Sequence, residues 1–188
     1  MSALKLKIYN IFFPVIKRLV VFFFSLKKTR LCTAFYSSLR YVPGLRYFCI
    51  NTDSEIVLVN LDDHEIAKSL FCTGLFDFEK LLTSIDIIKA KNKNFESNVL
   101  VDIGANIGTI SIPAIKRGVF EKIVAFEPSI ENSKLLKVNL ILNNVDDKFV
   151  VHQSAVGNEN TYLDMELSSN NSGDHRISVS DSNGVYNE

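Results

Sequence analysis

A glycine-bearing turn with an acidic residue beside it is the first feature of this sequence whose residue types and spacing could do chemistry. Asp102 is the fourth residue of the apolar run Val99–Ile103, Gly104 follows this run directly, and Gly108 lies four residues later. Gly104 has no Cβ, so the backbone can turn sharply there and a ligand can approach it closely. Gly108 allows the next helix to pack near the strand. The segment therefore predicts a loop that cradles a nucleotide-type ligand.

A second acid, Glu127, follows the next apolar run, Lys122–Phe126, and lies 23 residues after Gly104. A carboxylate at that place can accept hydrogen bonds from both hydroxyls of an unphosphorylated ribose. The loop departs from the dinucleotide-binding pattern, because Asn106 stands where the second glycine would be and Asp102 would repel a pyrophosphate. The sequence thus predicts a ligand without phosphates that carries a cationic centre, and adenosine with a sulfonium tail fits.

The histidines and cysteines suggest less chemistry. The three histidines and three cysteines lie far apart in the sequence without the spacing of zinc ligands, so we expect no metal site. His175, in a polar turn, is the candidate general base for removing a hydroxyl proton, whereas His152 lies within an apolar run and is expected to be a buried core residue. An odd number of cysteines favours a reducing, cytoplasmic compartment over a disulfide framework.

An alternation of strands and helices is expected to position these residues. The apolar runs and helical periodicity predict three strands with two helices between them: Val99–Ile103, Thr109–Arg117, Lys122–Phe126, Ile130–Leu142 and Lys148–Ala155. A hairpin of Tyr162–Leu167 with Arg176–Ser180 is expected after them. This order is typical of an α/β fold with a parallel sheet and right-handed crossovers.

Upstream, a strand at Ile56–Val59, a helix opened by the acids at 62 and 63, and an amphipathic helix at Asp77–Lys89 are expected, and residues 40–50 are expected to form a connecting loop. We accordingly divide the chain into a basic, aromatic, helical extension (1–50), a strand and helix cap region (51–97) and a ligand-binding domain (98–188).

The charge of the chain is unevenly distributed. Nine of the 21 Lys and Arg residues lie in the first 50 residues, which contain no Asp or Glu, so the remainder holds 12 bases and all 21 acids. An acidic domain disfavours a nucleic-acid partner. In the basic segment, apolar runs at 8–16 and 19–26 are separated by Lys17 and Arg18, and are too short to span a bilayer. Two alternatives stay open for residues 1–30: peripheral contact with the inner face of a membrane, or a helix packed on the domain.

Four motifs occur in an order that resembles the FkbM-type methyltransferases: Val101–Gly108, Ala125–Asn132, Ala155–Gly157 and Asn171–Gly173. The resemblance covers about 100 residues. It implies a class I, Rossmann-like fold that binds S-adenosylmethionine and transfers its methyl group to a hydroxyl, often of a sugar, a glycolipid or a related acceptor.

The resemblance also implies roles for single residues. Around the methionine end of the cofactor it places Gly104, Ala105 and Asn106, with Asp102 steadying the loop or accepting from the amino group. Glu127 would hold the ribose, and the adenine would be bordered by Pro128, Ser129 and Ser154. The segment Leu70–Asp77 is similar to the family's Gly-x-aromatic-Glu segment, which caps the cofactor pocket, but has Asp77 in place of Glu.

The sequence departs from the family after the hairpin. The family continues with a Leu-Asp segment and a strand carrying Lys-x-Asp-x-Glu-Gly-x-Glu, and neither occurs before Glu188. We therefore expect an incomplete parallel sheet whose open edge can pair with another chain. Two functions stay open: an O-methyltransferase, or a truncated and catalytically inactive remnant that at most binds the cofactor.

Overall fold

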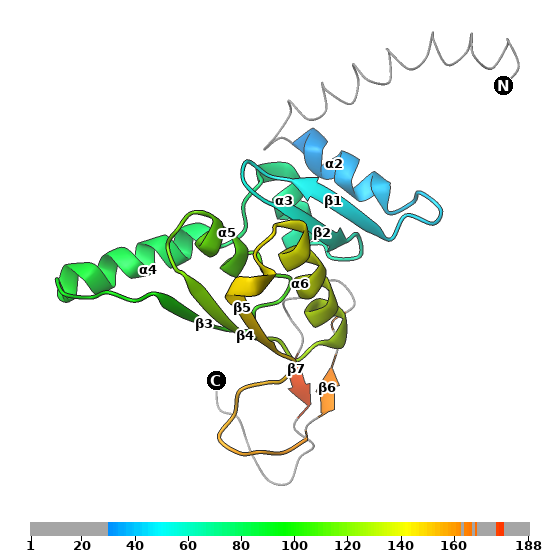
Figure 1. The fold of residues 1–188 in the computed structure, drawn as a ribbon. Coiled ribbons are helices and arrows are strands. Elements are labelled where there is room, and N and C mark those ends of the chain that lie inside the picture. Colours follow the sequence, from blue (N-terminus) through cyan, green and yellow to red (C-terminus); the bar gives the residue numbers. More distant parts are fainter. Residues whose placement is uncertain (1–29, 163, 167, 169–175, 179–188) are drawn as a thin grey trace, which may run out of the picture.

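The computed structural model describes residues 30–162, 164–166, 168 and 176–178. Figure 1 shows the helices and strands, which are, in chain order, α2 (Arg30–Leu39), β1 (Tyr47–Asn51), β2 (Ile56–Asn60), α3 (Ile66–Thr73), α4 (Phe78–Lys91), β3 (Val99–Ile103), α5 (Ser111–Lys116), β4 (Lys122–Phe126), α6 (Ile130–Leu142), the 3-10 turn η1 (Asp146–Lys148), β5 (Phe149–His152), β6 (Asp164–Glu166) and β7 (Arg176–Ser178). The predicted extension through residue 29, with its membrane contact, lies outside the described residues. No helix in the described part has the length and apolar character to cross a membrane.

The centre of the fold is a parallel sheet in the order β3-β4-β5. α5 connects β3 to β4 and α6 connects β4 to β5, as the sequence predicts, so the Rossmann-like α/β fold class is confirmed. The third strand is shorter than expected. It ends at His152, which pairs with Phe126 at the end of β4, so residues beyond His152 have no strand to continue along. The predicted hairpin is confirmed as the antiparallel pair of β6 and β7.

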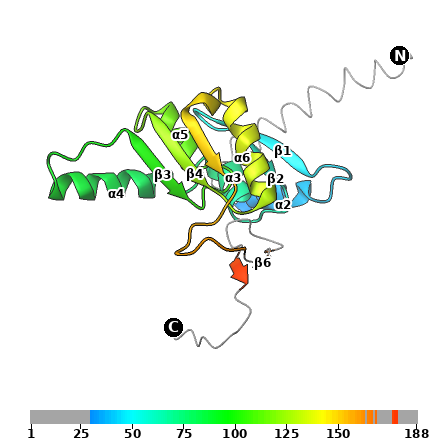
Figure 2. The same ribbon diagram turned by 60° about the horizontal axis from the view of Figure 1, so that its bottom comes forward.

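The two helices cover only one face of this sheet, as the view in Figure 2 also indicates. The strands follow one another in the order β3-β4-β5. Because both connections between them have the same handedness, α5 and α6 lie on the same side of the sheet. The side chains on that side form a buried cluster with both helices and with the start of α4, including Ile112, Ile123, Ala125 and Leu136. The alternate residues of the strands face the other way, and Val101 is 55% exposed there. The open face is therefore apolar, with Val99, Ile103 and Val150 exposed as well.

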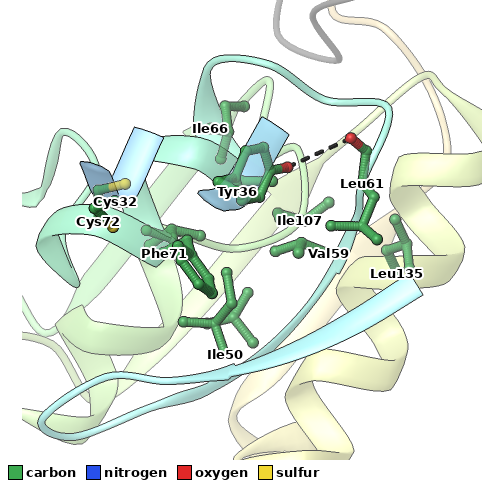
Figure 3. Close-up of a cluster of buried hydrophobic side chains, with 13 residues drawn as sticks. Cys32, Tyr36, Ile50, Val59, Leu61, Ile66, Phe71, Cys72, Ile107 and Leu135 are labelled. Atoms are coloured by element: carbon green, nitrogen blue, oxygen red, sulfur yellow. Dashed lines mark hydrogen bonds between the residues drawn. The ribbon is translucent and has the colours of Figure 1, made fainter. Parts of the chain in front are cut away.

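A second layer is built from the antiparallel β1–β2 hairpin, α2 and α3. Figure 3 shows its buried cluster, in which Phe71, Ile50 and Val59 pack together and the Tyr36 hydroxyl points to the Leu61 carbonyl. β1 corrects the expectation of a loop over residues 40–50. Burial alternates along this strand, with Ile50 buried and Phe48 partly buried against the same cluster, and each of its residues pairs with one of β2.

The start of α3 is fixed by a carboxylate, as expected from the acids at 62 and 63. Asp63 Oδ1 accepts hydrogen bonds from the backbone N–H groups of Glu65, Ile66 and Ala67 at 2.9, 2.7 and 3.3 Å. These are N–H groups that have no partner within the helix. The helix ends at Gly74, whose φ of 74° is in the left-handed region that glycine adopts without strain. Both ends of α3 are thus set locally by the sequence.

Candidate functional site

The loop between β3 and α5 is anchored at the end of the neighbouring strand. The N–H groups of Gly104 and Ala105 both donate to the carbonyl of Phe126, at 2.9 and 3.0 Å. Gly104, Asn106 and Gly108 all have positive φ, at 81°, 50° and 91°. Such angles are unfavourable for a residue with a Cβ, and Asn tolerates them better than most. The turn therefore depends on these residue types, as the sequence predicts.

The two glycines serve different purposes. A Cβ added to Gly108 would lie 2.7 Å from Ile112 Cδ1 and 2.8 Å from Leu136 Cδ1, so this glycine lets two helices approach the loop. A Cβ added to Gly104 would meet no atom within 4 Å. The space beside Gly104 is open and lies in front of the loop, where a ligand could come close to the backbone.

Glu127 connects this loop to the start of α6. Its carboxylate is buried, with the residue 4% exposed. One oxygen, Oε2, accepts from the N–H of Asn106 at 2.7 Å, and Oε1 accepts from the N–H of Ser129 at 2.9 Å. Ser129 in turn caps α6, since its hydroxyl accepts from the N–H of Asn132. An ionised carboxylate has about four acceptor positions, so two remain on Glu127 for the hydroxyls of a ligand.

Asp102 lies one strand away and is partly buried. It accepts a hydrogen bond from the hydroxyl of Ser111, the first residue of α5. Burial raises the pKa of Asp102 above its ordinary value, while the hydrogen bond from Ser111 acts in the opposite direction. The net shift is upward because desolvation penalises the charged form, and a positive charge brought near Asp102 would favour that charged form.

A hollow of about 470 Å³ opens beside the glycine loop. Its walls come from the end of β3 and the loop that leads to α5, from the start of α3 and from the start of α4. They consist of Asp102, Gly104, Ala105, Asn106, Thr109, Ile110, Glu65, Ile66, Phe76, Asp77 and Lys80. The volume is within the range of small-molecule sites. Three carboxylates and one ammonium group line it; Asp77 pairs with Lys80, and Glu65 pairs with Lys68 at 3.1 Å. Asp102 is therefore the wall carboxylate best placed to attract a positive charge on a ligand.

The start of α4 contributes a charged pair to this hollow. Asp77 has a φ of 58° and its Oδ1 lies 2.7 Å from Nζ of Lys80. The structure therefore brings Asp77, expected to cap the pocket, to the glycine loop. Lys80 and Glu65 were not anticipated as wall residues. Lys80 could have been found from its spacing, because a residue three positions after an acid in a helix lies on the same face. Glu65 carries no such signal.

The predicted cofactor-binding residues fall into those that line the hollow and those beside it, and Gly108 belongs to the second set. Asp102, Gly104, Ala105 and Asn106 line the hollow, whereas Glu127, Pro128 and Ser129 lie at the adjacent end of β4 and do not. Ser154 lies exposed in the chain that follows β5. His175 lies outside the described residues.

His152 corrects the expectation of a buried core histidine. It is exposed at the last position of β5, and its ring stacks on that of Phe126 with centroids 4.8 Å apart. Both residues stand on the face of the sheet that α5 and α6 leave uncovered, which is why an apolar run does not bury the imidazole.

Comparison with known proteins gives no family for this chain. No protein-family model matches the sequence, and no curated protein matches it. The solved structures that match parts of it include three distant proteins. The complex of aTrm5 with tRNALeu covers 60% of this chain and 29% of its own, with 20% identity and a TM-score of 0.37.

The other two are likewise distant. A SAM-dependent methyltransferase from Agrobacterium tumefaciens covers 58% of this chain and 33% of its own, with 14% identity and a TM-score of 0.38. The Pyrococcus abyssi tRNA (uracil-54, C5)-methyltransferase in complex with S-adenosyl-L-homocysteine covers 58% and 24%, with 19% identity and a TM-score of 0.35.

This chain spans a third or less of the length of each of these proteins. The likenesses are too slight to assign a substrate, and the tRNA in the aTrm5 complex belongs to that protein. Membership of the FkbM-type family and the absence of a nucleic-acid partner therefore stay predictions from the sequence.

Proposed function

We propose that this chain binds S-adenosylmethionine at the carboxyl ends of β3 and β4 and acts as part of a class I methyltransferase. The observation that carries the proposal is the hydrogen bond between Glu127 Oε2 and the N–H of Asn106. It joins the acid expected to hold a ribose to the loop expected to hold the rest of the cofactor. Ligands of open α/β sheets bind outside the carboxyl ends of the strands, where both residues lie.

The lining of the hollow supports the choice of ligand. S-adenosylmethionine, when bound, supplies an electrophilic methyl group on a positively charged sulfur. Asp102, Asp77 and Glu65 surround the hollow with carboxylates that suit the sulfonium and the amino group. Lys80, which pairs with Asp77, is the cation available to the carboxylate of the cofactor. A phosphate-bearing cofactor would meet repulsion from Asp102, since Asp77 and Glu65 are paired with Lys80 and Lys68.

The glycine loop supports the same ligand on steric grounds. The open space at Gly104 allows a ligand to lie against the backbone, and Ala105, the next residue, adds only a methyl group. Glu127, already oriented by two N–H donors, keeps two acceptor positions for the hydroxyls of a ribose. The cofactor would thus be positioned by groups that are in place before it binds, which reduces the ordering cost of binding.

Transfer to a hydroxyl of a sugar, a glycolipid or a related acceptor is the finer proposal, and it rests on the resemblance of the motifs. Methyl transfer depends mainly on holding donor and acceptor in line, so a general base is secondary. A second candidate is favoured by the open face of the sheet, where Val101 and Ile103 are exposed. In that case the chain binds the cofactor without transferring its methyl group.

Calorimetric titration with S-adenosylmethionine and S-adenosylhomocysteine tests the proposal. Glu127→Ala is expected to weaken binding by at least about tenfold, the equivalent of ~1.4 kcal/mol, because a charged hydrogen-bond acceptor is lost. Glu121→Ala is the matched control, since this exposed acid stands just before the other end of β4. A folded wild-type chain that binds neither ligand would refute the proposal.

Transfer of a labelled methyl group then separates the two candidates. The purified chain is incubated with labelled S-adenosylmethionine and, in separate reactions, with glycolipid, soluble glycan and tRNA. Label in a glycan hydroxyl supports the O-methyltransferase, and label in tRNA replaces it with a nucleic-acid acceptor. Binding without label in any acceptor favours the binding-only candidate.

A further inference from the structure

Two asparagines, Asn139 in α6 and Asn143 directly after this helix, take the place of a neighbouring strand along the outer edge of β2. Asn139 Oδ1 accepts from the N–H of Leu58 at 2.7 Å, and its Nδ2 donates to the carbonyl of the same residue at 3.2 Å. Asn143 does the same at Ile56, with distances of 3.0 and 2.7 Å. A side-chain amide carries a donor and an acceptor together, as a backbone peptide does. The edge of the hairpin is satisfied in this way without a further strand.

The spacing of the two elements explains the match. Residues four apart in a helix lie on one face, about one turn from each other. Alternate residues of a strand point their backbone groups to the same edge. Asn139 and the capping residue Asn143, one turn further on, therefore meet Leu58 and Ile56 on β2, which are two residues apart. Both asparagines are buried, with exposed fractions of 0% and 5%, so these bonds are protected from water.

Asn139 makes one contact that Asn143 lacks. Its Nδ2 also donates to the carbonyl of Ile107, at 3.0 Å. Ile107 belongs to the glycine loop and lies between Asn106 and Gly108, two of the three loop positions with positive φ. The side chain of Ile107 points into the cluster of the hairpin layer, near Val59 and Leu135 in Figure 3. Asn139 and the hairpin layer thus contact the loop at Ile107, a residue that does not line the hollow.

We propose that Asn139 is a positioning residue for the glycine loop, which couples the β1–β2 hairpin to cofactor binding. The proposal rests on the proposed function of that loop. One amide group fixes the carbonyl of Ile107 and the edge of β2 at the same time. A disturbance of β2 then reaches the loop, and a ligand that fixes the loop stabilises β2, since such coupling is reciprocal.

Asn139→Ala and Asn143→Ala form a matched pair for testing this. Both remove two hydrogen bonds to β2, but only Asn139→Ala releases the carbonyl of Ile107. Amide hydrogen exchange without ligand is measured for residues 47–60 and 104–108. We expect both variants to exchange faster in the hairpin, and only Asn139→Ala to exchange at least about tenfold faster in the loop. Equal exchange of the loop in the two variants would overturn the proposal.

A second measurement uses the wild-type chain. Saturation with S-adenosylhomocysteine is expected to slow the exchange of the Leu58 N–H, although β2 does not line the hollow. Binding without any slowing in β2 would contradict the coupling. Absence of binding would refute the proposed function instead, while the comparison of the ligand-free variants still decides the role of Asn139. If Asn139→Ala does not fold, Asn139→Ser and Asn143→Ser replace the pair, because the smaller hydroxyl retains part of the hydrogen bonding.

Discussion

Replacing either glycine of the loop with alanine is expected to separate packing from binding. Both residues have positive φ, 81° at Gly104 and 91° at Gly108, so both variants carry a similar backbone strain. Their surroundings differ. The new methyl group at Gly108 would lie 2.7 Å from Ile112 and 2.8 Å from Leu136, whereas at Gly104 it would meet nothing within 4 Å.

The expected losses of stability follow from these contacts. A left-handed conformation costs a residue with a Cβ about 1–2 kcal/mol, and the smaller entropy of the unfolded alanine chain offsets about 0.4–1 kcal/mol of this. Overpacking at Gly108 adds about 1–3 kcal/mol. Gly104→Ala should therefore lose about 1 kcal/mol, and Gly108→Ala about 2–4 kcal/mol. In a domain of this size each kcal/mol lowers the Tm by about 2–4 °C, so the two Tm values should differ by several degrees.

Binding should show the opposite order. The methyl group of Gly104→Ala projects into the space beside the hollow, and we expect it to weaken S-adenosylhomocysteine binding by at least about tenfold, or ~1.4 kcal/mol. Gly108 does not line the hollow, so the Gly108→Ala variant should keep the wild-type affinity for S-adenosylhomocysteine at temperatures where it is folded. Thermal unfolding and calorimetric titration measure the two effects. Equal losses of Tm, or a greater loss of affinity in Gly108→Ala, would refute the reasoning.

Three further predictions concern other contacts. Burial holds the pKa of Asp102 above its ordinary value of 3.8, so the folded state binds the proton more tightly and this contribution to stability is lost as the pH rises through the raised pKa. Asp102→Asn should remove that dependence from the urea-unfolding midpoint, and Ser111→Ala should raise the pKa further, as seen by NMR titration of the carboxyl. Arg117→Ala should cost about 1–3 kcal/mol in urea unfolding, because the buried Glu55 carboxylate would lose an ion pair at 3.7 Å. Val101→Lys should leave the chain folded and reduce its self-association in light scattering, since Val101 lies on the open face of the sheet.

The parts of the fold that the sequence predicted well are those that depend on neighbouring residues. The strand, turn and helix around Gly104 are specified by a continuous apolar run followed by residues that permit positive φ. The start of α3 depends on Asp63, three residues before Ile66, and is equally local. Such features need no knowledge of the rest of the chain.

The parts that were missed depend on contacts between distant segments. The predicted end of the helix at Leu142 is confirmed, and Asn144, two residues later, has a φ of 54°. The bonds of Asn143 to Ile56 span 87 residues, and no sequence pattern announces them. β1 is a strand because β2 pairs with it. Likewise, the exposure of His152 follows from which face of the sheet the helices cover, a property of the topology and not of the strand.

The position of the glycine loop between the two buried clusters has a consequence for how binding and folding depend on each other. Ile107 belongs to the cluster of the hairpin layer, whereas Ala105, two residues earlier, belongs to the cluster between the parallel sheet and its helices. A pentapeptide whose side chains are divided between two cores cannot shift toward one of them without opening a cavity in the other. Conditions that loosen either layer should therefore weaken cofactor binding before the chain unfolds as a whole, even where the altered contact is far from the hollow.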